Sequence, residues 1–177
     1  MSGIFGVASR TNCIDDLFYG TDYHSHLGTE FAGLAIQGNQ LHRTIHRISH
    51  GQFKNLFYDF YHDRSGEMGV GVISDFDPQP IVVQARFGTF SLVSAGLISN
   101  AQELGERLVE EGVTFSEILN GRLNQTELVA KMIALKPDPV AGIEHVFDHV
   151  KGSVSLLLMT REGVYAACDR HGRFPLA

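Results

Sequence analysis

The sequence predicts an α+β fold in which two layers of strands are covered by helices, an α/β/β/α sandwich. Strand-like segments rich in apolar and β-branched residues recur along the whole chain, and helices with capping signals separate them. The last long segment, residues 153–169, is typical of a hairpin. With 177 residues, 44% of them hydrophobic, and no low-complexity linker, residues 1–177 are predicted to form one domain.

In the first half of the chain, strands are expected at 3–8, 30–38, 39–49 and 68–74, and helices at 14–27 and 52–60. The run at 3–8 has little apolar/polar alternation, which is typical of a strand buried on both faces, and it places residue 2 at the mouth of that strand. The segment 39–49 alternates, with Arg43 and Arg47 on one side, which indicates a half-exposed strand.

In the second half, strands are expected at 80–88 and 89–99, and helices at 101–111, 124–135 and 139–150. Asn100 is predicted to cap the first of these helices, with Glu103 at its third position and Gly112 at its end. Asn124 is predicted to cap the second helix.

The charge and the segment lengths exclude several classes of protein. The net charge is −6 and the pI is near 5.8, with Lys and Arg dispersed, so no nucleic-acid partner is expected. No apolar stretch approaches the roughly 18 residues of a membrane span, so we expect no membrane association and a cytoplasmic location. Two cysteines without metal-ligand spacing indicate free thiols in a reducing compartment.

The remaining chemistry-bearing residues favour structural roles. His42, His46 and His50 are four residues apart, which on a strand separates neighbours by about 13 Å, too far to share an ion, although on a helix they could converge. We therefore expect no metal and no cofactor. We expect the two cysteines and four of the phenylalanines to be buried: Cys13, Cys168, Phe31, Phe53, Phe57 and Phe60. We expect Asp75 and Asp77 to lie in a turn beside Pro78.

Ser2 stands behind an initiator Met and before a predicted strand, which is the layout of an N-terminal nucleophile. In that chemistry the side chain of the first mature residue attacks a carbonyl, and its own α-amine, with a pKa of about 7.7 to 8.0, acts as the base. Met-Ser-Gly is also a common processed terminus, so the pattern by itself does not assign this role.

Seven segments in order resemble the glutaminase domain of class II glutamine amidotransferases, most nearly of the amidophosphoribosyltransferase type: SGIFGV, HLGTEFAGLAI, GEMGVG followed by PQP, SAGLISNAQEL, TELVAKMI, KGSVSLLL and GVYAACDRHGRFPL. The resemblance implies the four-layer α/β/β/α sandwich of N-terminal-nucleophile hydrolases, a glutaminase activity and a role in purine biosynthesis. It also implies a synthase or phosphoribosyltransferase partner, as a following domain of a longer parent protein or as a subunit. The sequence leaves a homo-oligomer open.

The departures from that family fall on its chemistry. The resemblance implies a cysteine nucleophile where Ser2 stands, and an arginine for the substrate α-carboxylate where Ser74 stands. It implies an asparagine oxyanion donor at Ala95, followed by the backbone amide of Gly96, and an aspartate for the substrate ammonium at Gln125. Two further family arginines are replaced, by Leu27 and Phe174.

These replacements predict that glutamine hydrolysis is lost or nearly lost. Charge-assisted hydrogen bonds contribute about 1.5 to 3 kcal/mol each, and one side-chain oxyanion donor about 10²- to 10³-fold in rate. Two alternatives stay open: a catalytically silent scaffold, regulatory or binding domain, and a hydrolase of a different amide that uses Ser2. The serine itself is an engineered replacement, a natural nucleophile or a residue without a catalytic role, and engineering would not explain the other changes.

Overall fold

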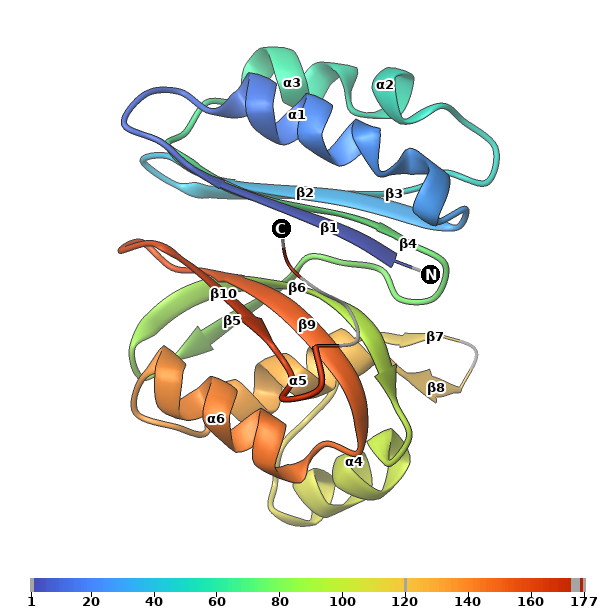
Figure 1. Cartoon of the computed structure of the whole chain (residues 1–177), viewed down its shortest axis with the longest axis vertical. Helices are drawn as coiled ribbons and strands as arrows, with labels where there is room; N and C mark the ends of the chain where they lie inside the picture. The colour runs from blue at the N-terminus through green and yellow to red at the C-terminus, as the bar shows by residue number, and fades with distance from the viewer. Residues whose placement is uncertain (1, 120, 173–175, 177) are drawn as a thin grey trace.

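Two four-stranded antiparallel sheets stack face to face, and helices cover the outer face of each (Figure 1). The computed structural model describes residues 2–119, 121–172 and 176. The predicted α/β/β/α sandwich is therefore confirmed.

The first sheet, sheet A, has the strand order β1-β4-β2-β3. Its strands are β1 (Ser2–Ala8), β2 (Phe31–Gln37), β3 (Leu41–Arg47) and β4 (Met68–Ser74). Three helices lie on its outer face: α1 (Ile14–Tyr23), α2 (Phe53–Leu56) and α3 (Tyr58–Asp63). A single 3₁₀ turn at Ser25–Leu27 follows α1.

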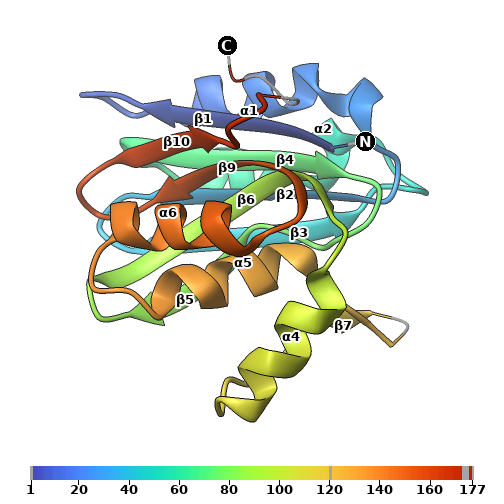
Figure 2. The same ribbon diagram turned by 60° about the horizontal axis from the view of Figure 1, so that its bottom comes forward.

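The second sheet, sheet B, has the order β10-β9-β6-β5. Its strands are β5 (Ile81–Ala85), β6 (Gly88–Ile98), β9 (Gly152–Met159) and β10 (Val164–Cys168). Its helices are α4 (Ala101–Glu110), α5 (Gln125–Ala134) and α6 (Pro139–His149), of which α5 and α6 cover the sheet while α4 projects from the body (Figure 2). A small hairpin, β7 (Ile118–Leu119) and β8 (Arg122–Leu123), precedes α5.

Each of the three interfaces between layers has its own apolar cluster. The largest lies between sheet B and its helices and includes Phe90, Leu128 and Ile133, all fully buried. A second joins sheet A to α1–α3, and a third fills the space between the two sheets. The two sheets thus pack face to face, and residues at the ends of their strands come together at one edge of the sandwich.

Some local predictions were wrong because tertiary contacts decide them. The 3–8 segment is a strand, but it lies at the edge of sheet A and is only half-buried. The helix expected at 14–27 ends at Tyr23, the one expected at 52–60 is split into two, and the β7–β8 hairpin was not predicted. The remaining strands and helices lie where the sequence placed them, within a few residues.

The two predicted asparagine caps behave differently. Asn124 Oδ1 accepts a hydrogen bond from Glu127 N (3.0 Å), as predicted for a cap of α5. Asn100 makes no side-chain cap on α4. Its side chain instead bridges to the end of α6, donating to His149 O (3.1 Å) and accepting from Lys151 N (2.8 Å). A long-range partner has replaced the local one.

Candidate functional site

A cavity of about 360 Å³ lies between the two sheets at the ends of β1, β4 and β6. Its lining includes all five site residues expected from the sequence: Ser2, Ser74, Ala95, Gly96 and Gln125. They come from four different elements, so the fold brings together positions as far apart in the chain as residues 2 and 125.

The wall formed by sheet A is a single row of paired residues. Ser2 is paired with Ser74, Ser74 with Phe31, and Phe31 with Arg47, across β1, β4, β2 and β3. Side chains of directly opposed residues project from the same face of an antiparallel sheet, so these four point the same way, and all four line the cavity.

The hydroxyl of Ser2, at the nucleophile position, lies next to the hydroxyl of Ser74. Ser2 Oγ donates to Ser74 Oγ at 3.4 Å, a long hydrogen bond. Ser74 Oγ also accepts from the amides of Phe76 and Asp77, at 3.2 Å each. The Ser74 side chain therefore holds the first residues of the segment that follows β4. Its hydroxyl is neutral, so it offers no positive charge to a substrate carboxylate.

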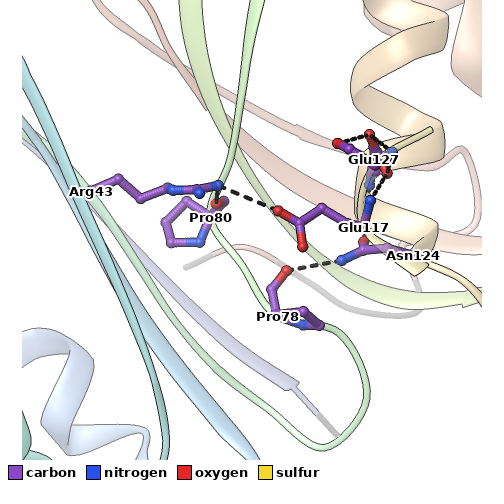
Figure 3. Close-up of polar contacts among 7 residues, drawn as sticks. Arg43, Pro78, Pro80, Glu117, Asn124 and Glu127 are labelled. Atoms are coloured by element: carbon purple, nitrogen blue, oxygen red, sulfur yellow. Dashed lines mark hydrogen bonds and ion pairs between the residues drawn. The ribbon is translucent and has the colours of Figure 1, made fainter. Parts of the chain in front are cut away.

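The segment 75–80 crosses from sheet A to sheet B beside the cavity and is fastened at several points. Asp77 Oδ2 accepts from Gln125 N (2.9 Å), and Asn124 Nδ2 donates to Pro78 O (2.9 Å; Figure 3). The buried side chain of Gln79 binds both main-chain groups of Ser94, donating to the carbonyl (3.1 Å) and accepting from the amide (2.8 Å). This segment is a fixed part of the cavity wall.

Gly33 permits the crossing. Gly33 lies within β2. A Cβ on Gly33 would overlap the carbonyl oxygen of Gln79, so a larger residue would displace the 75–80 segment. The backbone of β2 thus packs closely against a segment that is distant in sequence.

The wall formed by sheet B is tightly constrained at Gly96. Its φ is +142°, and a Cβ there would overlap the carbonyl oxygen of Ser153 on β9. The neighbouring Ala95 is buried and supplies only a methyl group. Gln125 uses its side chain inside the protein, because Oε1 accepts from Ile98 N at 2.9 Å. This hydrogen bond to the Gln125 carboxamide holds the end of β6 against α5.

Asp169 secures the adjoining end of β9. Its Oδ2 accepts from Ser153 Oγ (2.6 Å) and Val154 N (2.9 Å), and its Oδ1 accepts from the amides of His171 and Gly172. The hydrogen bond from Ser153, together with those from the backbone amides, lowers the pKa of this carboxyl although partial burial opposes the shift.

Charged side chains also line the cavity, at positions that the sequence analysis did not select: Glu30, Arg47, Asp75, Asp77 and Arg122. Burial raises the pKa of Asp77, and the amides of Gln125 and Thr126 and the charge of Arg122 partly offset this. The alternation of β3 places Arg43 and Arg47 on one face, but only the strand pairing shows that this face turns toward Ser2.

Glu127 is a structural carboxylate that the sequence analysis did not identify. It is 2% exposed and accepts hydrogen bonds from Ser116 N, Ser116 Oγ and Glu117 N, at 2.8 to 3.2 Å. Arg43 approaches the same loop, donating to Pro80 O (3.1 Å) and lying 4.0 Å from the Glu117 carboxylate (Figure 3). These contacts position the β7–β8 hairpin, which brings Arg122 to the cavity.

The cysteines, the β3 histidines and three of the four phenylalanines singled out from the sequence lie outside the lining of this cavity. Burial raises the pKa of the Cys13 thiol to about 11, which makes it unreactive, while Cys168 is exposed rather than buried as expected. His42 and His46 lie on β3, as predicted, and His46 packs edge-on against Phe57. Phe53, Phe57 and Phe60 are core residues, and Phe31 is a buried residue that borders the cavity.

Over residues 2–119, 121–172 and 176, no group of three His, Cys, Asp or Glu side chains could hold a metal ion. Among the helices of the same residues, none is long and apolar enough to cross a membrane. Phe174, where the resemblance implies an arginine, lies outside the described residues.

Comparisons with known proteins agree with this geometry. The family model of the glutamine amidotransferase domain matches residues 67–177. The amidophosphoribosyltransferase of Methanocaldococcus jannaschii is 28% identical over 99% of this chain and 39% of its own length. That of Lacticaseibacillus casei is 25% identical over 98% of this chain and 92% of its length.

Solved structures support the fold. One described as the allosteric regulatory enzyme of purine biosynthesis superposes with a TM-score of 0.84 at 20% identity, over 97% of this chain and 38% of that one. Glutamine phosphoribosylpyrophosphate amidotransferase from B. subtilis gives a TM-score of 0.81 at 21% identity, over 96% of this chain and 37% of that one. This chain spans about two fifths of the length of the M. jannaschii relative and of both solved structures. It has the N-terminal-nucleophile hydrolase fold and belongs to the glutamine amidotransferase family, as a class II domain of the amidophosphoribosyltransferase type.

Proposed function

We propose that this amidotransferase domain has lost, or nearly lost, the ability to hydrolyse glutamine. The observation that carries the proposal is the composition of the cavity at the positions that the resemblance assigns to catalysis and substrate binding. Two hydroxyls, a methyl group and an internally bonded carboxamide stand there, on Ser2, Ser74, Ala95 and Gln125.

Each of these groups is a poor substitute for the chemistry that the reaction needs. A serine hydroxyl is a weaker nucleophile than a thiol at neutral pH, and the Ala95 methyl group cannot donate to an oxyanion. Ser74 and Gln125 are neutral, and their side chains are used by Phe76, Asp77 and Ile98. The deficits concern a single site and would not add simply, but together they amount to several orders of magnitude in rate.

The remaining part of the proposal concerns the wider protein. A synthase or phosphoribosyltransferase partner, as a domain or a subunit, fits the length of the M. jannaschii relative, of which this chain matches 39%. We also propose a purine-biosynthetic setting, which is the setting of one structural neighbour, the allosteric regulatory enzyme of purine biosynthesis. We further propose that residues 1–177 act as one domain in the cytoplasm.

Ammonia release from L-glutamine, followed in a coupled assay, tests the loss of hydrolysis. We expect the same background rate for the unaltered chain and for Ser2→Ala, because the serine contributes no turnover. Ser2→Cys should stay at that background too, since the other three positions remain unsuited to glutamine. Turnover near ordinary enzyme rates, abolished by Ser2→Ala, would overturn the proposal.

The intact mass of the purified protein supplies an independent check on the nucleophile. An N-terminal nucleophile needs a free α-amine on its own residue, so Met1 has to be removed before Ser2 could act. Retention of Met1 would exclude hydrolysis by Ser2 of any amide, including the alternative that the domain acts on a different substrate.

A further inference from the structure

The guanidinium of Arg47 is the feature of the cavity that neither the resemblance nor the proposed function explains. It lies over the ring of Phe31, 5.2 Å from the ring centroid, and so reaches from the edge strand β3 back across β2. The next strand in that direction is β4, where Ser74 is paired with Phe31. The cation is therefore brought to the row that leads to Ser2.

Arg47 and Arg43 lie on the same face of β3 but differ in their polar contacts with the described residues. Arg43, four residues earlier on the same face of β3, donates to Pro80 O and lies 4.0 Å from the Glu117 carboxylate. Arg122 acts electrostatically on Asp77. Among the residues that the structure describes, none forms an ion pair or hydrogen bond with the Arg47 side chain, whose described contact is with the ring of Phe31.

The acidic groups of the cavity leave that cation available. Asp77 is engaged by the amide of Gln125, and Asp75 accepts from both the amide and the hydroxyl of Thr29. Glu30 lies at the same mouth, and its negative charge disfavours a ligand with two carboxylates. The volume, about 360 Å³, falls within the range of about 300 to 1,000 Å³ that is usual for small-molecule sites.

We propose that the cavity binds a small monocarboxylate, with its carboxylate on the Arg47 guanidinium. Phe31 supports the guanidinium from one side, and the planar guanidinium can form a paired interaction with the two carboxylate oxygens. Neighbouring strands are about 4.8 Å apart, so Phe31 and Ser2 are separated by roughly 10 Å. The body of the ligand extends over Ser74 toward Ser2 and is bound without being hydrolysed. The assignment rests on the proposed function, because it gives a ligand to a site that no longer hydrolyses glutamine.

Calorimetric titration of the unaltered chain tests this assignment, with L-glutamine, L-alanine, propionate, succinate and inorganic phosphate as probes. We expect at least one of the three monocarboxylates to bind, and its Kd to rise about 10- to 100-fold in Arg47→Gln. Arg47→Lys keeps the charge but not the planar guanidinium, so its Kd should lie between those of the unaltered chain and of Arg47→Gln. Arg86→Gln removes an equal charge from an exposed position outside the cavity lining and should leave Kd unchanged.

Three results would overturn the assignment: no monocarboxylate binds, only succinate or phosphate binds, or the affinity is the same in Arg47→Gln. Circular dichroism and the urea midpoint of each variant show whether it is folded. The ammonia assay is run on the same samples, which separates the two proposals. Binding together with turnover would reject the loss of hydrolysis and keep the ligand assignment, whereas absence of both would do the reverse.

Discussion

The two walls of the cavity differ in how far their polar groups are already engaged by the protein itself. On the sheet B side, the carboxamide of Gln125 holds the end of β6, and Asp169 holds the start of β9. On the sheet A side, the row from Ser2 to Arg47 ends in a guanidinium without an ion pair among the described residues.

This difference separates the framework of the site from its binding capacity. Polar groups that already bond within the protein stabilise a wall and have less to offer a ligand. A cation supported by an aromatic ring and facing a cavity can still form a new charge-assisted bond. We therefore expect substitutions in the sheet B wall to affect folding, and substitutions in the sheet A row to affect binding.

The largest effect on stability is expected for Gly96→Ala. A side chain there would combine a φ of +142° with an overlap against Ser153 O, so β6 and β9 would have to separate. We expect the free energy of unfolding to fall by about 4 kcal/mol, measured by urea denaturation. Gly163→Ala is the matched control, because nothing lies within 4 Å of a Cβ at Gly163. Equal effects of the two substitutions would show that the sheet B wall is not constrained at Gly96.

Glu127→Ala is expected to cost about 3 kcal/mol in the same measurement. The substitution removes a buried carboxylate and leaves the amides of Ser116 and Glu117 without their acceptor. Glu111→Ala is the control, since the Glu111 side chain is half-exposed and its partner among the described residues is Arg107, in a surface ion pair of 3.6 Å. If Glu127→Ala cost no more than Glu111→Ala, the loop before β7 would not depend on this carboxylate.

The apolar segments and capping signals predicted the layered α+β sandwich, and the resemblance to class II amidotransferases implied the five positions that line the cavity. The sequence did not predict which partner a polar side chain would choose. Asn124 and Asn100 have similar local signals, but only Asn124 caps its helix, while Asn100 bonds to His149 and Lys151. The strong local pattern of α4 carries no information on the position of the end of α6.

The site charges were missed for the same reason. Arg47 reads in the sequence as the exposed side of an alternating strand, and only the pairing of β3 with β2 and of β2 with β4 places it in line with Ser2. Glu127 likewise reads as an acidic residue in the first turn of a helix, a position that usually faces solvent. The position of Arg47 depends on the register of strands that are distant in sequence. The burial of Glu127 depends on a loop that folds back onto α5.

The smallest effect is expected for Asp169→Asn, and it depends on pH. The pKa of Asp169 is lowered in the folded protein, so its carboxylate contributes stability that is present above the unfolded pKa of about 3.9 and lost as the pH falls through the lower, folded value. We expect Asp169→Asn to cost about 1 kcal/mol at pH 7, because an amide oxygen accepts more weakly from Ser153 and Val154, with a difference that shrinks below about pH 4. Urea midpoints measured from about pH 7 to about pH 3 test this, with Asp148→Asn, at an exposed ion pair with Arg170, as the control. A loss of stability that is constant over that range would mean that the start of β9 is held by the shape of this side chain and not by its charge.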